Sequence, residues 1–349
     1  MDHRPHPDPA STSIWNETLS RTAGQVLKAG RLWLGLGLSG GAIYLALRQV
    51  DISLVRQTMG TIRPSWAGLA VFSVILTAGV KAIRWRALYP ATNGRPRLSA
   101  LVPALLAGMM VNLLLPARLG EIVRIYAVER LEGESKALSL GTIALEKWAD
   151  LLMLFVMFAG LMLVMDWPEW LATWGRSLAM ITVVVTVLLI GALGFLDRPP
   201  GIIQRCMRRW PAHWRDRIVQ GWEAIYRGLL TLRSRRQMGT LIAWTLVTWA
   251  IAAVTNLLVL RALDLTASLV VAMAVLVILQ AGSAVPSSPA KIGVFHYLAM
   301  MGLVLFGIPQ ESALAFAIWL HLLVVGVLIL LGIVSMTWIT LRDPSRAAS

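Results

Sequence analysis

Long, continuous apolar runs constrain this chain more than any other feature of its sequence. Residues 313–341 contain no Lys, Arg, Asp or Glu, and comparable runs recur along the chain. A helix needs about 20 apolar residues to cross a bilayer, whereas the strands of a membrane barrel alternate between apolar and polar residues. Mean hydropathy is +0.69 over 349 residues. We therefore predict an all-α polytopic membrane protein with about seven or eight transmembrane helices.

The net charge of +14 fits a membrane protein better than a nucleic-acid-binding protein. Its bases cluster in short loops between apolar runs, and residues 197–236 hold ten Arg against three acidic residues. Loops rich in Lys and Arg stay in the cytoplasm. We expect both termini on that side of a bacterial inner membrane. The single cysteine, Cys206, excludes an internal disulfide and a thiolate metal cluster.

The chain divides into a few regions by composition. Residues 1–28 carry Pro, Asp, Ser and His without periodicity and are expected to form a disordered cytoplasmic tail. Residues 29–341 form one integral membrane domain, followed by a short tail, 342–349. Its halves, 29–196 and 237–341, are joined by residues 197–236, where Trp, Ile and Leu recur among Arg residues. This amphipathic segment lies on an anionic membrane surface, packs between the halves, or does both.

A break follows the apolar run at residues 101–111. Within the next residues come Pro116, Arg118, Gly120 and Glu121. Lipid cannot satisfy backbone groups freed by a helix break, so such a break must be packed in protein or line a wet cavity. Ionisable groups there are functional candidates.

A second break repeats the first. Residues 289–293 and residues 116–120 share the order Pro, Ala, base, aliphatic, Gly. Interrupted segments at corresponding positions of two halves indicate a transporter site. We expect an inverted repeat whose two breaks enter from opposite faces and meet near mid-membrane. The alternative is two unrelated turns at the surface.

The charges also constrain the path of the interrupted segments. Arg95 and Arg97 precede residues 98–115, and the bases of residues 118–136 follow them. Both sets remain cytoplasmic if residues 98–115 form a re-entrant hairpin. The alternative is a full span, which would put Arg95, Arg97 and the N-terminus outside. Residues 269–308 are either a second hairpin, entering from outside, or a pair of spans.

Two acidic residues stand out in the apolar run at residues 137–165. Glu146 and Asp150 are four residues apart and therefore share one face of a helix. Because like charges at that spacing repel, a nearby cation is expected. The candidates are Arg118, Arg124 and Lys147.

The other embedded polar residues have simpler interpretations. Arg84 and Arg86, near the end of an apolar run, are expected to snorkel to the interface. Lys81 lies one turn deeper and can point inward. We expect Arg118 to be coupled to Glu121, three residues along the chain.

Three groups of residues resemble motifs of the flippase-like family that shares the membrane region of lysylphosphatidylglycerol synthases. They are Asn112-x-x-x-Pro116-x-Arg118-x-Gly120-Glu121-x-x-Arg124, Glu146-x-x-x-Asp150 and Pro286-x-x-Pro289-x-x-Ile292-Gly293. The resemblance covers about residues 32–341. It implies an all-helical domain with paired re-entrant helices that moves a lipid between leaflets. Relatives often carry Gly-Gly and an acid in the last motif, where this chain has Ala290, Lys291 and His296.

The leading hypothesis is ATP-independent translocation of an anionic phospholipid or lipid-linked intermediate. Arg118, Arg124 and Lys291 would hold the phosphate, and Glu121, Glu146 and Asp150 would position the bases or take up a proton. The full set of candidate substrate-binding residues is Asn112, Arg118, Glu121, Arg124, Glu146, Asp150, Lys291 and His296.

No cofactor, metal or nucleic-acid partner is expected. The resemblance does not imply aminoacyl transfer, because the synthases need an added soluble domain, and we expect no enzymatic activity. The alternatives are a membrane-embedded transferase and an accessory subunit of lipid or polyprenyl-glycan biosynthesis. The expected partners are anionic membrane lipids, a second copy of the chain, or a lipid-biosynthesis enzyme.

Overall fold

The computed structural model describes residues 30–48, 50–90, 94–115, 119–165, 169–196, 234–283 and 288–342. All regular structure in these residues is helical, which confirms the predicted all-α class. The helices are α2 (Gly30–Leu47), α3 (Ile52–Gly60), α4 (Pro64–Leu88), α5 (Leu98–Leu114), α6 (Gly120–Glu132), α7 (Lys136–Val164), α8 (Glu169–Leu196), α11 (Arg235–Ala262), α12 (Leu269–Gly282), η3 (Pro289–Lys291), α13 (Val294–Val304) and α14 (Gln310–Leu341). Pro116, Arg118, Pro286 and the predictions for residues 1–28 and 197–233 lie outside the described residues.

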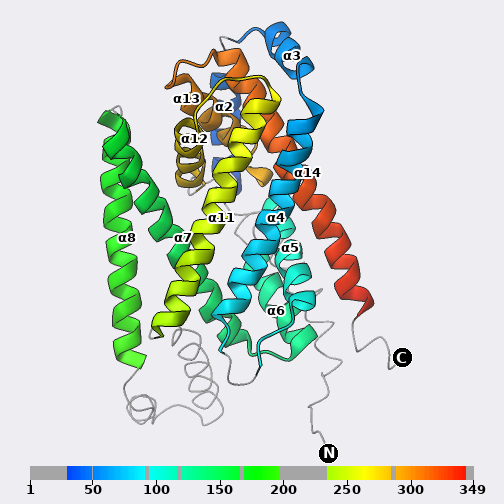
Figure 1. Cartoon of the computed structure of the whole chain (residues 1–349), viewed down its shortest axis with the longest axis vertical. Helices are drawn as coiled ribbons and strands as arrows, with labels where there is room; N and C mark the ends of the chain where they lie inside the picture. Colours follow the sequence, from blue (N-terminus) through cyan, green and yellow to red (C-terminus); the bar gives the residue numbers. More distant parts are fainter. Residues whose placement is uncertain are drawn as a thin grey trace, which may run out of the picture.

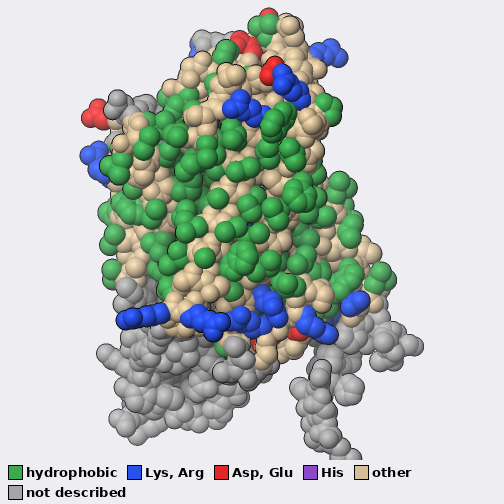
Figure 2. Space-filling model, viewed as in Figure 1, with side chains coloured by type: hydrophobic (Ala, Val, Ile, Leu, Met, Phe, Trp, Pro, Cys, Tyr) green, Lys and Arg blue, Asp and Glu red, His purple; other side chains and the backbone are tan. Residues whose placement is uncertain are grey.

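Within this part of the chain, four helices are long and apolar enough to cross a membrane: α4, α7, α11 and α14. Only 28% to 44% of their most apolar windows is buried, so most of their apolar side chains face outward, as lipid contact requires. Figure 2 shows this apolar band, with a row of Lys and Arg side chains across its lower end. The chain is therefore a multi-pass membrane protein. The larger number of spans, seven or eight, stays a prediction.

Each half of the chain contains one long helix, a hairpin of two shorter helices and a second long helix, in that order (Figure 1). In the first half, α4 runs downward, α5 and α6 form a hairpin in the lower part of the molecule, and α7 runs upward. In the second half, α11 runs upward, α12 and α13 form a hairpin in the upper part, and α14 runs downward. The two series thus have opposite directions, as an inverted repeat requires.

The helix ends follow local sequence chemistry. Pro64 is in the first turn of α4, where a missing N–H costs nothing. Ser234 and Ser268 cap α11 and α12 by accepting a hydrogen bond from a first-turn N–H. A short helix, α3, lies between α2 and α4 and is capped by Asp51.

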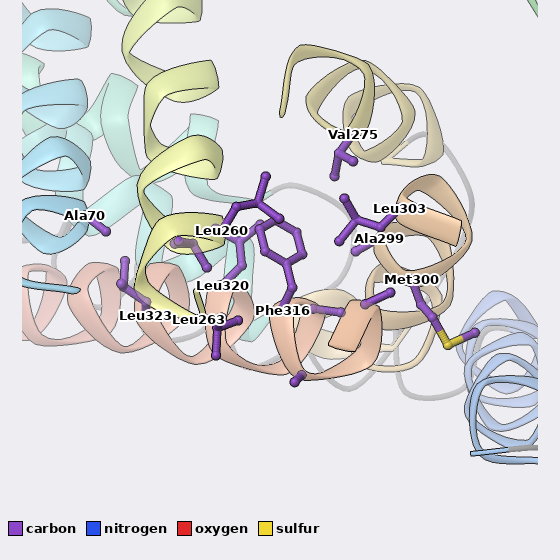
Figure 3. Close-up of a cluster of buried hydrophobic side chains, with 14 of the residues drawn as sticks. Ala70, Leu260, Leu263, Val275, Ala299, Met300, Leu303, Phe316, Leu320 and Leu323 are labelled. Carbon is purple, nitrogen blue, oxygen red and sulfur yellow. The ribbon is translucent and has the colours of Figure 1, made fainter. Parts of the chain in front are cut away.

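The main apolar core joins α4, α11, α12, α13 and α14 in the upper part of the molecule. Figure 3 shows Phe316 of α14 pointing into it, between Leu260 of α11 and Ala299 and Leu303 of α13. A second core lies among α4, α5, α6, α7 and the end of α14. The hairpins are therefore packed within the helical body, where a broken helix can be tolerated.

Candidate functional site

The first hairpin is closed by one asparagine. The Asn112 side-chain oxygen, at the end of α5, accepts a hydrogen bond from the Gly120 N–H at 2.7 Å. Its amide nitrogen donates to Glu121 Oε2 at 2.8 Å. Asn112 thus satisfies a free N–H at the start of α6 and fixes the carboxylate that follows it. In this conformation both polar atoms of the Asn112 amide bond within the hairpin.

The two arms of this hairpin approach closely at glycines. A Cβ on Gly108 would overlap the Arg124 side chain, and a Cβ on Gly120 would overlap the Gly108 backbone and Asn112. The absence of both side chains lets the stem of Arg124 cross α5 toward the interior. Gly120, the glycine of the motif, allows the two arms to approach, and Gly108 leaves room for the Arg124 side chain.

Arg124 forms a buried, two-pronged ion pair with Glu146 of α7. Its NH2 and NH1 nitrogens lie 2.7 and 3.2 Å from the carboxylate oxygens. Both residues are only 3% exposed, and the guanidinium also lies 4.0 Å from the ring centroid of Trp85. Of the three cations proposed to face the two acidic residues, Arg124 is thus confirmed as the partner of Glu146.

Arg84 completes the cluster from α4. It is fully buried, with NH1 at 2.6 Å and NH2 at 3.1 Å from the two carboxylate oxygens of Asp150. Its NH2 also lies 3.5 Å from Glu146. The prediction that Arg84 snorkels to the interface is wrong, because the buried carboxylate of Glu146 and the half-buried carboxylate of Asp150 hold it inside. The spacing of Arg84 along the chain does not reveal this, because the contact depends on the packing of α4 against α7.

Residues of α11 reach the same cluster. The Thr245 hydroxyl accepts a hydrogen bond from Arg84 NH1 at 3.3 Å, and Trp249 donates to Asp150 at 3.3 Å. Sequence analysis singled out neither residue. The Arg84 and Arg124 Nε atoms are buried, and no partner accepts a hydrogen bond from them among the described residues. Each arginine thus retains unused donor capacity.

Glu121 pairs with α7 through a different cation from the one expected. Lys147 Nζ lies 3.0 Å from Glu121 Oε1. The predicted partner of Glu121, Arg118, is outside the described residues. Lys147 is therefore a counter-ion of Glu121, whereas the coupling of Arg118 to Glu121 stays a prediction. The first hairpin is connected to α7 twice, through Lys147 and through Arg124.

The second break has a strained backbone. Ala290 and Lys291 have φ values of 53° and 59°, in the left-handed region that favours glycine. The His321 Nε2 atom of α14 lies 2.8 Å from the Ala290 carbonyl oxygen. His321 is thus a buried, hydrogen-bonded packing residue. The Gly293 N–H donates to His296 Nδ1 at 3.3 Å, so His296 caps the start of α13.

The second break also packs against the N-terminal helix. Gly293, with φ 90°, lies so close to the Ser39 carbonyl that a Cβ would overlap it. The Ser288 N–H donates to the Ser39 hydroxyl at 2.9 Å. Because η3 also contacts α5, the two hairpins lie against each other. The structure brings Asn112 to Glu121, Arg124 to Glu146 and Asp150 to Arg84. It places Lys291 and His296 at the other hairpin, next to α5.

Residues 32–332 match the family described as the lysylphosphatidylglycerol synthase TM region. The chain belongs to this family. Comparison with curated proteins gives no match.

The matched residues include both hairpins and every member of the Arg84–Glu146–Arg124–Asp150 cluster. Membership of the lysylphosphatidylglycerol synthase TM family indicates a function related to membrane lipids. A lipid-related function therefore has to account for the buried charges and for the contact between the two hairpins.

Proposed function

We propose that the protein moves an anionic phospholipid, or a lipid-linked intermediate with a phosphate headgroup, between leaflets without ATP. The observation that carries the proposal is the buried Arg84–Glu146–Arg124–Asp150 cluster, placed beside two broken helices. Ionisable residues at membrane depth are costly, and they mark substrate or ion pathways in transporters.

The cluster has the chemistry of a phosphate site in its substrate-free form. A guanidinium group binds a carboxylate and a phosphate with the same two-pronged geometry. Glu146 therefore occupies, on Arg124, the position that two phosphate oxygens would take. Transfer of Arg124 from Glu146 to the headgroup leaves Glu146 facing Arg84, 3.5 Å away. The carboxylate keeps one cation throughout, so the exchange avoids an unpaired buried charge.

The hairpins give this exchange a path. Their opposite directions and the contact between η3 and α5 support a pair of re-entrant, inverted elements. Rocking one half against the other would open the interior alternately to each leaflet. The outward-facing apolar side chains of α4, α7, α11 and α14 let acyl chains remain in the bilayer while the headgroup crosses.

The orientation follows from the bases. Arg86, Arg235, Arg236 and Arg342 lie at the lower ends of α4, α11 and α14, which we assign to the cytoplasmic side of a bacterial inner membrane. The lipid is carried unchanged, so no covalent step is part of the proposal. A second copy of the chain or a lipid-biosynthesis enzyme is the protein partner we propose.

Vesicles of phosphatidylcholine and labelled phosphatidylglycerol test the proposal directly. The purified protein should expose inner-leaflet label to a membrane-impermeant quencher faster than empty vesicles do. Arg124→Gln should slow this movement about tenfold or more, because a charged partner of the headgroup is lost. Arg236→Gln, an exposed arginine outside the cluster, is the matched control and should behave as wild type.

A variant with both Arg124→Gln and Glu146→Gln separates transport from folding. It removes both members of the buried pair and should recover thermal stability while transport stays lost. Wild-type protein no faster than empty vesicles would contradict translocation. Full transport by the double variant would show that Arg124 and Glu146 are structural only.

A further inference from the structure

A pocket lies at the other end of the two helices that contribute Arg84 and Trp249. It has a volume of about 380 Å³ and is lined by Arg63, Trp66, Arg261, Asp264, Leu265 and Thr266. Pockets that bind small ligands span about 300–1,000 Å³. Figure 2 shows basic and acidic side chains gathered over the upper ends of α4 and α11. This outer pocket is separate from the buried cluster at the lower end of the same helices.

The lining is held in place by contacts between the two helix ends. The Arg63 N–H donates to the Ala262 carbonyl at 2.8 Å, and the Arg63 guanidinium lies 2.8 Å from Asp264. Asp264 has φ 57°, a left-handed conformation that turns the chain sharply after α11. The loop before α4 and the loop after α11 therefore form one structure.

The charge of the pocket favours an anion. Two arginines face one aspartate, and the side chains of Arg63 and Asp264 are 54% and 61% exposed. An exposed ion pair of this kind contributes little stability and is readily exchanged. A phosphate can thus replace Asp264 at Arg63 and also reach Arg261.

The surface below the pocket favours a lipid over free phosphate. Leu69, Phe72 and Leu76 continue along α4 from Trp66 at spacings of three and four residues, and they are 49%, 61% and 42% exposed. Trp at such a position sits at the level of lipid headgroups. Acyl chains can therefore lie on α4 while the headgroup occupies the pocket.

We propose that this outer pocket binds the phosphate of an anionic phospholipid in the leaflet opposite the base-rich end. The inference rests on the proposed function in one respect: the pocket would be where the headgroup enters or leaves the α4–α11 pair. Ser73 and Thr255 join these helices between the two sites, with their hydroxyl oxygens 2.8 Å apart.

Photo-crosslinking tests the site without requiring transport. The full chain, with a photoreactive amino acid in place of Thr266, is placed in nanodiscs of equal phosphatidylglycerol and phosphatidylcholine. Phosphatidylglycerol should be crosslinked in roughly two- to fivefold excess over phosphatidylcholine. This ratio corresponds to the free energy of an exposed charge pair. The combined variant Arg63→Gln and Arg261→Gln should reduce the excess to none.

Two further variants make the result specific. Arg56→Gln removes an exposed base from α3, outside the pocket, and should keep the excess. Asp264→Asn removes the competing carboxylate and should increase it, since asparagine tolerates the left-handed backbone. Equal crosslinking of both lipids by the wild-type protein, or an unchanged excess after loss of both arginines, would overturn the proposal.

Inorganic phosphate distinguishes the two sources of the ligand. At constant ionic strength set with chloride, phosphate should not abolish the lipid excess. Abolition would mean that the pocket binds free phosphate, which would overturn the lipid assignment. The outcome is independent of the flipping assay, because lipid selection here can be present in a protein that moves no lipid, and absent from one that does.

Discussion

At the scale of single residues, the charges of the cluster depend on one another. Glu146 contacts Arg124 at 2.7 Å and Arg84 at 3.5 Å, and Arg84 in turn holds Asp150. Removing one member of a buried pair leaves its partner charged in a low-dielectric interior. Such a loss costs about 3–5 kcal/mol, whereas removing both members is often nearly neutral.

Arg84→Gln should therefore lower the thermal stability in detergent. Because Asp150 keeps 30% of its side chain exposed, we expect the lower part of the range, about 3 kcal/mol. Adding Asp150→Asn should restore part of the loss. Unfolding followed by tryptophan fluorescence measures both effects, with Arg236→Gln as the exposed control. An effect of Arg84→Gln as small as that of the control would show that Arg84 is not integral to the cluster.

Sequence reasoning found the acids of this cluster more easily than its bases. Glu146 and Asp150 were identifiable because a carboxylate in an apolar helix requires a partner. Arg84 was not, because an arginine near a helix end can reach the interface or the interior with the same spacing. Which of the two it does depends on the helices that surround it, here α7 and α11.

At the scale of elements, the two hairpins solve the same problem differently. The first break is closed by hydrogen bonds from Asn112 to Gly120 and Glu121. The second break is held by hydrogen bonds to Ser39 and His321. Its backbone is strained at Ala290 and Lys291. A non-glycine residue in the left-handed region costs about 1–2 kcal/mol.

Ala290→Gly should relieve part of this strain and raise the free energy of unfolding by about 1 kcal/mol. The matched control is Ala243→Gly, at an exposed position inside α11, which should lower stability by about the same amount. Thermal unfolding of both variants in one detergent gives the comparison. A loss of stability at both positions would mean that Ala290 is not strained.

Gly293→Ala should have the opposite effect from Ala290→Gly, although both lie in the same break. Gly293 combines φ 90° with a backbone contact to Ser39 that a Cβ would overlap. We expect a loss of about 2 kcal/mol or more, detected by the same unfolding measurement. Wild-type stability of this variant would mean that α2 does not pack on the break as described.

The positions of the breaks could be predicted from the sequence, whereas their internal geometry could not. Pro116 and Pro289 interrupt apolar runs, and a proline in an apolar helix is visible without a structure. The strain at Ala290 and the contact between η3 and α5 arise from packing between segments far apart in sequence. No local pattern encodes such packing.

At the scale of the whole molecule, the Lys and Arg content of the loops predicted the direction in which each long helix crosses the membrane. The row of bases lies at one end of the apolar band (Figure 2). Helices α4 and α14 run toward that end and α7 and α11 run away from it (Figure 1), which fits the topology expected from the loop charges. The pairing of α4 with α11 was not predicted, because it depends on the shapes of two apolar surfaces. Residues of both helices contribute to the buried cluster at one end of the pair and to the outer pocket at the other.

The structure also decides where the ends of the hairpins lie relative to each other. Arg97, just before α5, is 3.0 Å from Glu132 at the end of α6. The two open ends of the first hairpin are therefore adjacent, as the predicted re-entrant arrangement requires. The loop before α12 and the start of α14 lie together at the opposite end of the molecule (Figure 1).

Single cysteines should report this arrangement in a Cys206→Ser background. Arg95→Cys and Ser135→Cys flank the first hairpin, whereas Thr266→Cys and Pro309→Cys flank the second, and all four positions are exposed. In inside-out vesicles an impermeant maleimide should label the first pair, and in right-side-out vesicles the second. Labelling of Arg95→Cys and Ser135→Cys from different sides would mean that the first hairpin crosses the membrane. The two hairpins would then not be an inverted, re-entrant pair, and this result would contradict the headgroup path proposed between them.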